Sequence, residues 1–419
     1  TLSAKTNKTG IIFQILSKNI FSGFVVSLIA LPLGLGLALA SEAPPISGII
    51  AAVVGGVIVS LLGGSKVTIA GPGNGLVIVL LAAIGTLGGG DLYQGYLFTL
   101  AAIVLSGILM LLLGFLKMGR LANFFPASAI QGMLAAIGIG ILAKQFHIMV
   151  GHNNETGTIV QLLVAIPNDF LDLLKTADFN MLFASAIGLI SLLIMVFYSK
   201  IRNKYFQLIP APMWILILSV GVSYFYTLLG KQYPMTLDYL VSIPDNVLTD
   251  LAFPDFGKIM DKDFIVAVFA ITLIASIESL LSIKAVDKLD PLMRRSNVNK
   301  DLKALGLATV VSGLLGGLNV VTVIARSSVN VNNGATNKSA NFFHALFLVG
   351  FVLIFQEQLR RIPLAALAAI LVSTGYKLAN PESFKKIIQI GKEQVLIFLT
   401  TLITTLFTNL ITGIAAGIL

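Results

Sequence analysis

The chain has 419 residues, of which 56% are hydrophobic and only 11% are charged, whereas soluble domains carry about 25% charged residues. This composition excludes an ordinary soluble protein and predicts an all-α integral membrane protein with many spans. A net charge of +9 suggests nucleic acid in a soluble protein, but in a membrane protein Lys and Arg collect in cytoplasmic loops. We therefore expect no nucleic-acid partner. The absence of cysteine excludes disulfides and thiol catalysis.

Apolar runs predict fourteen membrane segments, several of them short. They are expected at 20–40, 45–62, 74–89, 93–116, 124–145, 179–198 and 209–229, and then at 263–283, 302–318, 325–337, 340–356, 362–377, 394–408 and 409–419. The segments 74–89 and 325–337 are too short, too polar or too rich in glycine for ordinary spans. The stretches 155–176 and 381–392 have the pattern of amphipathic helices at the membrane surface.

The distribution of basic residues predicts the topology. With the N-terminus in the cytoplasm, 20 of the 28 Lys and Arg residues fall on the cytoplasmic side, seven fall outside and Arg326 falls in the membrane. This bias agrees with the positive-inside rule. We expect a location in the bacterial inner membrane.

The two halves of the sequence resemble each other. Leu61–Gly64 and Leu314–Gly317 share the sequence Leu-Leu-Gly-Gly, 253 residues and seven segments apart. In each half an extended stretch with a threonine follows (Thr68 and Thr322), and then a polar break and a new helix. Because seven is odd, the halves must have inverted orientations. We predict inverted repeats at 1–230 and 231–419, a pattern that marks transporter binding sites.

The two breaks predict an anion site. Gly71–Gly75 interrupts the first half, and Ala325–Ser328 interrupts the second. A half-helix that begins inside the membrane directs unpaired N–H groups and positive partial charge toward its N-terminus. Arg326 adds a full charge and planar donors that suit an oxyanion. The alternative is that the glycines form a packing turn and that Arg326 is a structural or snorkelling residue.

Glu278 is the acidic residue placed deep in a predicted span, and Ser282 follows it by one helical turn. Three roles are open for Glu278: structural partner of Arg326, proton carrier, or ligand of a coupling cation such as Na⁺. With Thr322, these residues are the candidates for the coupling-ion site. Apart from Na⁺ at Glu278 and Ser282 we expect no metal and no cofactor.

Other polar residues have simpler interpretations. His147, His152 and His344 form no metal-ligand spacing, so we expect packing or loop roles for them. We expect Asp169, Asp172 and Asp178 on a solvated external surface. No nucleophile–base pair is placed in the membrane, which excludes an intramembrane enzyme.

Motifs along the whole chain resemble the sulfate permease (SulP, solute carrier 26) family of anion transporters. They are Ala30–Leu33, Ala43–Pro45, Gly48, Leu62–Ser65, Gly71–Pro72, Ile277–Leu281, Ser312–Gly317, Arg326–Asn330 and Gly334. The resemblance implies a fourteen-segment inverted-repeat fold shared with uracil permeases. It also implies a core domain from segments 1–4 and 8–11, a gate domain from segments 5–7 and 12–14, elevator-like movement and a homodimer in the bilayer.

The resemblance also implies site residues. The anion is expected between Gly73, Asn74 and Gly75 on one side and Ala325, Arg326 and Ser327 on the other. Glu278 matches the family's acidic position, which is Asp in the sodium-dependent bicarbonate branch and is followed there four residues later by Thr; Ser282 matches that hydroxyl here. Two departures from the family pattern are the Glu itself and the absence of a STAS domain from this sequence.

Together these features predict a secondary active transporter of a small inorganic oxyanion, sulfate or bicarbonate, coupled to Na⁺ or H⁺. An uncoupled anion channel or an anion exchanger is the alternative. The residues do not decide which anion or which coupling ion is used.

Overall fold

The structure is a computed structural model that describes residues 2–120, 126–153, 156–176, 178–201, 203, 206–247 and 249–418, with side chains from 13 to 417. Its first half contains α1 (Leu2–Ala40), α2 (Pro45–Leu62), α3 (Val77–Gly88), α4 (Leu92–Phe115), α5 (Ala127–Met149), α6 (Ile159–Lys175), α7 (Phe179–Phe197) and α8 (Ala211–Leu228). Its second half contains α9 (Lys262–Asp287), α10 (Val298–Leu314), α11 (Ile324–Asn332), α12 (Ser339–Ile354), α13 (Gln356–Arg360), α14 (Leu364–Leu378), α15 (Pro381–Ile390), α16 (Lys392–Phe407) and α17 (Leu410–Ile418). The mostly helical prediction is confirmed.

Seven of the described helices are long and apolar enough to cross a membrane: α1 from Phe13, α2, α4, α5, α7 with its following turn, α8 and α9. The stretches Asn74–Gly88 and Ser339–Ile354 are shorter apolar helices. The count of fourteen spans therefore stays a prediction. The helix predicted at 325–337 is shorter than expected, because α11 ends at Asn332. The starts predicted at 124 and 155 lie outside the described residues.

Local signals explain where several helices begin. Pro45 is the first residue of α2, a position where its missing N–H is not needed. Asp91 caps α4 by accepting a hydrogen bond from the Gln94 N–H at 3.0 Å. Thr158 and Gln161 form a capping box that starts α6. These ends are set by nearby residues, so the sequence predicts them well.

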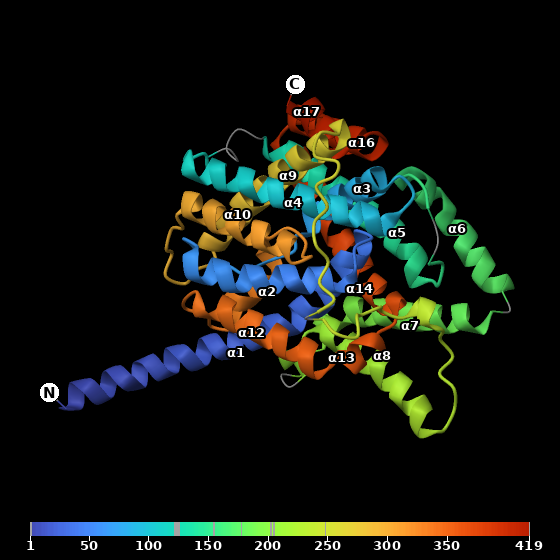
Figure 1. Cartoon of the computed structure of the whole chain (residues 1–419), viewed down its shortest axis with the longest axis horizontal. Helices are drawn as coiled ribbons and strands as arrows, with labels where there is room; N and C mark the ends of the chain where they lie inside the picture. Colours follow the sequence, from blue (N-terminus) through green and yellow to red (C-terminus); the bar gives the residue numbers. More distant parts are fainter. Residues whose placement is uncertain are drawn as a thin grey trace.

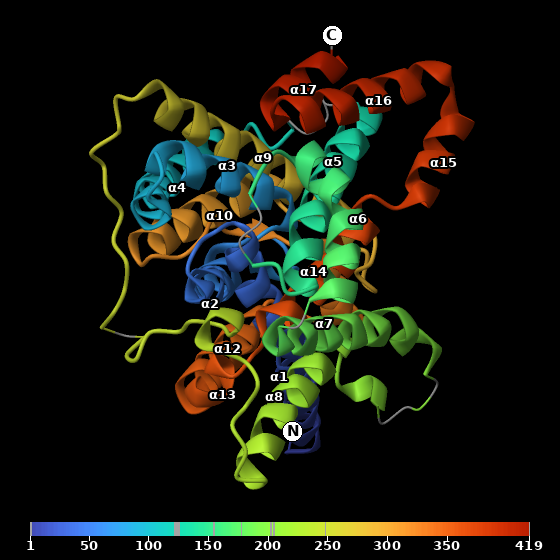
Figure 2. The ribbon, with the colours of Figure 1, turned by 90° about the vertical axis from the view of Figure 1, so that its right-hand side faces the viewer.

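The helices pack in two groups. Helices α1–α4 pack with α9–α12, mainly through α10 against α4 and α2 and through α12 against α1 and α2. Helices α5–α8 pack with α14–α17, mainly through α5 against α14 and α16. Figure 1 shows α2, α4, α10 and α12 side by side, and Figure 2 looks down the axes of α2 and α4. We call these sets the first and the second helix group.

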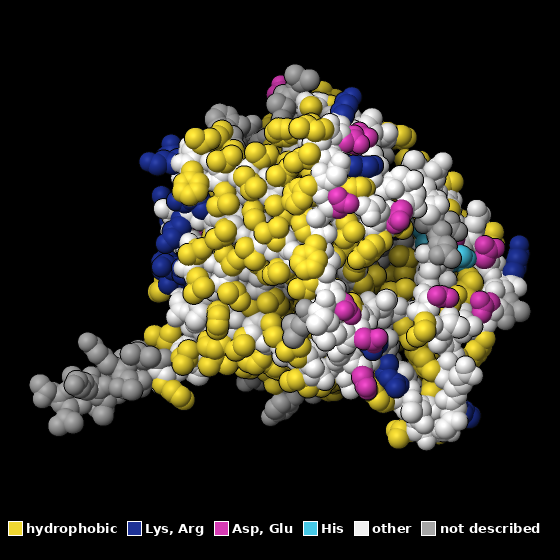
Figure 3. Space-filling model, in the orientation of Figure 1, with side chains coloured by type: hydrophobic (Ala, Val, Ile, Leu, Met, Phe, Trp, Pro, Cys, Tyr) yellow, Lys and Arg dark blue, Asp and Glu magenta, His cyan; other side chains and the backbone are white. Residues whose placement is uncertain are grey.

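The surface matches a membrane environment. Hydrophobic side chains cover the middle of the face in Figure 3, with a cluster of Lys and Arg at its left edge and most Asp and Glu toward the right. The N-terminus projects on the side of the Lys and Arg cluster (Figure 1). Exposed hydrophobic residues include Leu112, Phe115, Phe269 and Leu353. Such a broad apolar surface requires lipid rather than water around it.

Candidate functional site

Two short extended segments bring the two halves of the chain together. The strand β1 (Ala70–Gly71) pairs antiparallel with β2 (Val321–Thr322), with Ala70 opposite Thr322 and Gly71 opposite Val321. A 3₁₀ turn, η1 (Asn74–Leu76), and then α3 follow β1, whereas α11 follows β2 after one residue. The N-termini of two short helices therefore start from one strand pair. In this arrangement, unpaired N–H groups from both helices can donate hydrogen bonds to a single ligand.

Side chains of α11 and α12 hold β1 in place. The Ser327 Oγ accepts a hydrogen bond from the Ile69 N–H at 2.9 Å and donates one to the Val323 carbonyl at 2.7 Å. Asn330 Nδ2 donates to the Val67 carbonyl at 2.8 Å. Asn341 Oδ1 accepts from the Ala70 N–H at 3.3 Å. These bonds satisfy the extended backbone, which in a membrane protein must find its partners within the protein.

Arg326 is fully buried at the start of α11. Among the described residues its guanidinium makes one long hydrogen bond, from Nη2 to the Pro72 carbonyl at 3.5 Å, and Nε and Nη1 have no partner there. No ion pair within 4.0 Å joins it to an acidic side chain in the part of the chain that the structure describes. A buried guanidinium with unused donors carries a large desolvation penalty, which an anionic ligand would offset.

Glu278 reaches the start of the other half-helix. Its Oε1 accepts a hydrogen bond from the Gly75 N–H at 3.4 Å, and its Oε2 has no partner among the residues that the structure describes. A Cβ atom added to Gly73 or to Gly75 would lie only 2.7 Å from Glu278 Oε2. Similarly, a Cβ atom on Gly71 would overlap Arg326 Nη1. The missing side chains of these glycines allow the two charged side chains to approach the backbone closely.

The other candidate coupling residues lie near Glu278. Ser282 is buried one turn further along α9. Thr322 is buried in β2, and its N–H donates to Ser279 Oγ at 3.3 Å, which fixes the strand to α9. The structure thus places Glu278, Ser282 and Thr322 at the junction of α9 with the strand pair. It shows no group of three His, Cys, Asp or Glu side chains that could hold a metal ion among the described residues.

The predicted anion-site residues differ in their exposure and in the hydrogen-bond donors that they leave free. Asn74 is half-buried and Ala325 is exposed. The N–H groups of Ala325 and Arg326 belong to the first turn of α11 and have no acceptor within the helix. Ser327 differs, because its N–H donates to the Val323 carbonyl and its hydroxyl proton is also used. In this arrangement Ser327 braces the site and has no free donor.

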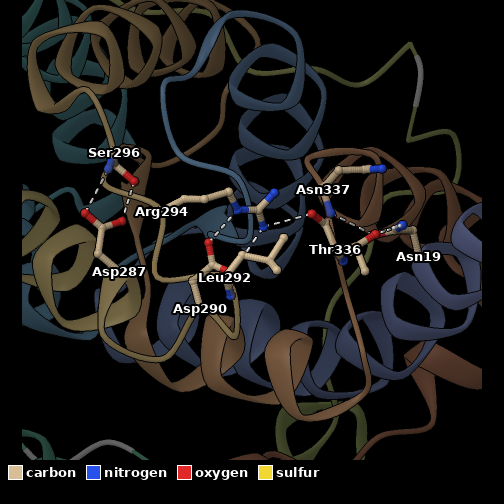
Figure 4. A network of polar contacts seen from close by, with 8 residues as sticks. All are labelled: Asn19, Asp287, Asp290, Leu292, Arg294, Ser296, Thr336 and Asn337. Atoms are coloured by element: carbon tan, nitrogen blue, oxygen red, sulfur yellow. Dashed lines mark hydrogen bonds and ion pairs between the residues drawn. The ribbon is translucent and has the colours of Figure 1, made fainter.

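A polar network ties three segments together at the end of the first helix group near the N-terminus (Figure 4). Arg294 Nε donates to Asp290 at 2.7 Å, and Arg294 Nη2 also donates to the Thr336 carbonyl at 2.9 Å. Asn19 Oδ1 accepts from the Thr336 N–H at 3.0 Å. Burial raises the pKa of the Asp290 carboxyl, but the hydrogen bond and the charge of Arg294 outweigh burial and hold this pKa below its ordinary value. The network joins α1 to the loops before α10 and α12.

Two buried polar residues contribute to the site region without having been expected there. Asn341 holds β1, as described above, and its spacing of three residues from His344 puts both on one face of α12. His344 is fully buried on the same face as Asn341. The only sequence signal was the presence of polar residues in an apolar segment, which does not reveal their partners.

One prediction about the surface is wrong. Asp172 and Asp178 are exposed as expected, but Asp169 is buried, and its Oδ2 lies 2.5 Å from His147 Nδ1. The other ring nitrogen of His147 lies 3.0 Å from the Leu162 carbonyl. Asp169 is seven residues after Leu162 and thus on the same, inward face of α6. The carboxylate is buried because a histidine on the neighbouring helix α5 pairs with it.

Residues 16–401 match the model of the sulfate permease family. The chain belongs to the sulfate permease family. It is 26% identical over 395 residues to a Bacillus subtilis (strain 168) protein named "Putative sulfate transporter YvdB", covering 93% of this chain and 69% of that one. It is 24% identical over 396 residues to the bicarbonate transporter BicA of Picosynechococcus, covering 94% and 66%. The chain thus spans about two thirds of the length of these relatives.

Solved structures show the same fold. The transmembrane domain of a cyanobacterial BicA is 22% identical with a TM-score of 0.78, over 97% of this chain and 98% of that one. The structure of SLC26A9 is 17% identical with a TM-score of 0.84, over 97% of this chain and 64% of that one. The predicted family is confirmed, and the family and its members are transporters rather than enzymes.

Proposed function

We propose that this chain is a secondary active transporter of a small inorganic oxyanion, with sulfate and bicarbonate as the leading candidates. The observation that carries the proposal is the buried Arg326, with two unused donor nitrogens, beside two helix N-termini that start from one strand pair. A guanidinium and two helix N-termini favour an anion with several oxygen atoms. Relatives named as sulfate and bicarbonate transporters support this choice of substrates.

Binding would use the backbone more than side chains. The anion would accept hydrogen bonds from N–H groups at Gly73–Gly75 and at Ala325–Arg326, together with the guanidinium of Arg326. Ser327 would position β1 rather than contact the anion, because its donors are already used. Such preformed donors lower the cost of removing the anion from water.

Coupling would arise because Glu278 and the anion compete for the same place. Glu278 already accepts the Gly75 N–H, and its second oxygen approaches Gly73 and Gly75 closely. An ionised carboxylate there repels an incoming anion and occupies one of its donors. A proton or a Na⁺ ion on Glu278 would remove the repulsion, so the anion and the coupling ion would bind together.

Either coupling ion is compatible with the structure. The two ions predict different dependences of transport on sodium and on pH. For Na⁺, oxygen atoms of Glu278, Ser282 and Thr322 would supply ligands, and transport would stop when choline replaces sodium. For H⁺, transport would rise as the external pH falls and would not depend on sodium. Measurement of sulfate and bicarbonate uptake into proteoliposomes under each ion gradient separates the two.

We further propose that the first helix group is a moving core domain and the second a gate domain, arranged as inverted repeats at 1–230 and 231–419. The antiparallel pairing of β1 with β2, one strand from each half, supports the inverted repeats. An elevator-like movement would carry the site across the bacterial inner membrane, in a homodimer with cytoplasmic N-termini. The Lys and Arg cluster beside the N-terminus supports this orientation (Figure 3).

An uncoupled channel or exchanger is the competing function. Purified protein in proteoliposomes with an imposed Na⁺ or H⁺ gradient should concentrate labelled sulfate or bicarbonate above equilibrium. A channel cannot do this, and an exchanger would require a counter-anion inside. Uptake that never exceeds the electrochemical equilibrium would contradict active transport.

A further inference from the structure

A cavity with a few polar residues in a mostly apolar lining lies between the two helix groups, and no residue of the strand pair lines it. Its volume is about 430 Å³, and it is bounded by the end of α1, the turn after it, and the starts of α4 and α14 together with the end of α5. Among the described residues that line it are Glu42, Tyr93, Lys144 and Gln145, but none of Gly73–Gly75 or Arg326. The charge distribution predicts that this end of the molecule faces outward.

The charged residues that line the cavity come from opposite helix groups. Lys144, on α5, donates to the carboxylate of Glu42, in the turn after α1. Their side chains are 16% and 25% exposed. This is the only contact recorded for the ammonium group of Lys144 among the described residues, so further N–H donors remain for a ligand.

Gln145 adds a donor that has no partner. The residue is only 2% exposed, and its Nε2 makes no hydrogen bond to any described residue. An unpartnered buried amide donor costs free energy, and a hydrogen bond to a ligand in the cavity would offset that cost. A lysine and a free amide donor on the same wall provide the chemistry that binds a small anion.

We propose that this cavity is an outer anion site, at which a small inorganic oxyanion replaces Glu42 at Lys144 and accepts a hydrogen bond from Gln145. The proposal rests on the proposed function, since it assigns the transported anion to this second site. The site captures the anion at the boundary between the two helix groups before the anion reaches Arg326. Anion binding also breaks the Glu42–Lys144 contact, which otherwise joins the two groups.

The cysteine-free sequence provides the test. Tyr93, which lines the cavity and is 58% exposed, is replaced in Tyr93→Cys to give a single thiol. The full chain is purified in detergent without added lipid, and the rate of modification by a neutral maleimide is measured in sodium sulfate, in sodium bicarbonate and in sodium gluconate of equal ionic strength. The same measurements are made with Arg326→Ala added. Leu39→Cys, on α1, is a second reporter in case the first variant does not fold.

We expect sulfate or bicarbonate to slow the reaction about fivefold relative to gluconate, with or without Arg326. Lys144→Gln should abolish this protection, and Lys144→Arg should retain it. Glu42→Gln should lower the anion concentration needed for protection about tenfold, because Lys144 is then free. If Glu42 and Lys144 form only a structural ion pair, Lys144→Gln and Glu42→Gln should change the protection of the thiol in the same direction. That result overturns the proposal. Equal rates in all three salts overturn it too, as does loss of protection in Arg326→Ala.

Uptake by the unmodified chain separates this inference from the proposed function. Concentrative uptake without protection of the thiol contradicts the outer site alone. Protection of the thiol in a protein that concentrates neither anion contradicts the proposed function alone.

Discussion

The replacement Glu278→Gln tests the competition between carboxylate and anion directly. An anion held by the N–H groups of Gly73–Gly75 lies roughly 5 Å from the carboxylate, where a unit charge repels each unit of anion charge by about 3 kcal/mol at an effective dielectric constant of about 20. Glu278 is half-buried rather than sealed from solvent, so part of this repulsion is screened. We expect sulfate to bind about 10 to 100 times more tightly to Glu278→Gln at alkaline pH without sodium, which corresponds to about 1.4–2.7 kcal/mol.

The assay is equilibrium binding of labelled sulfate to purified protein, titrated at several pH values with sodium or with choline. Affinity of the parent protein should fall as the pH rises if the partner is H⁺, and should rise with sodium if the partner is Na⁺. Affinity of Glu278→Gln should depend on neither. In proteoliposomes the variant should lose concentrative uptake and retain anion exchange. Glu357→Gln, at an exposed acid on α13, is the matched control and should behave as the parent.

Two results would refute this reasoning. Unchanged sulfate affinity in Glu278→Gln would show that the carboxylate does not oppose the anion. Accumulation of sulfate by the variant under an imposed ion gradient would show that Glu278 is structural only.

Three further predictions concern other residues. Arg326→Ala should lower the apparent affinity for anion at least about 100-fold, through loss of a buried charge–charge contact, and Arg326→Lys should restore this affinity only in part. Normal uptake by the alanine variant would show that Arg326 does not bind the anion. Gly73→Val should abolish anion binding because the added side chain would overlap Val321 and the carboxyl group of Glu278; binding equal to that of the parent would contradict the backbone cradle. The lowered pKa of Asp290 implies stabilisation that is fully present above its ordinary pKa of about 3.9 and is lost as the pH falls through its lower folded value. Asp290→Asn should therefore lower Tm by about 2 °C at pH 7 and by less near pH 3, measured by thermal unfolding; an equal decrease at both pH values would contradict the ion pair with Arg294.

The sequence predicts those parts of the site that depend on local composition. Gly71–Gly75 and Arg326 stand out because polar or glycine-rich residues interrupt apolar runs, and the structure brings them together at one strand pair. The pairing register and the bracing role of Ser327 depend on contacts across 250 residues or more. No local pattern specifies such contacts.

The error at Asp169 has a similar cause. An amphipathic segment predicts a polar outer face, but the partner of Asp169 is His147 on another helix. The spacing of seven residues from Leu162 was a usable signal, because it places the carboxylate on the apolar face. A charged residue on an apolar face predicts a buried partner, even where the partner itself cannot be named.

The strand pair constrains how an anion could leave the site. Hydrogen bonds between β1 and β2, together with the Val323 N–H to Ile69 carbonyl bond at 3.0 Å, join the two helix starts into one unit. Release by spreading these helices apart would break bonds that nothing in a membrane replaces. The donor geometry around the anion should therefore be the same on both sides of the membrane. Half-saturation constants measured from inside and from outside, at zero membrane potential and equal coupling-ion concentrations, should then agree.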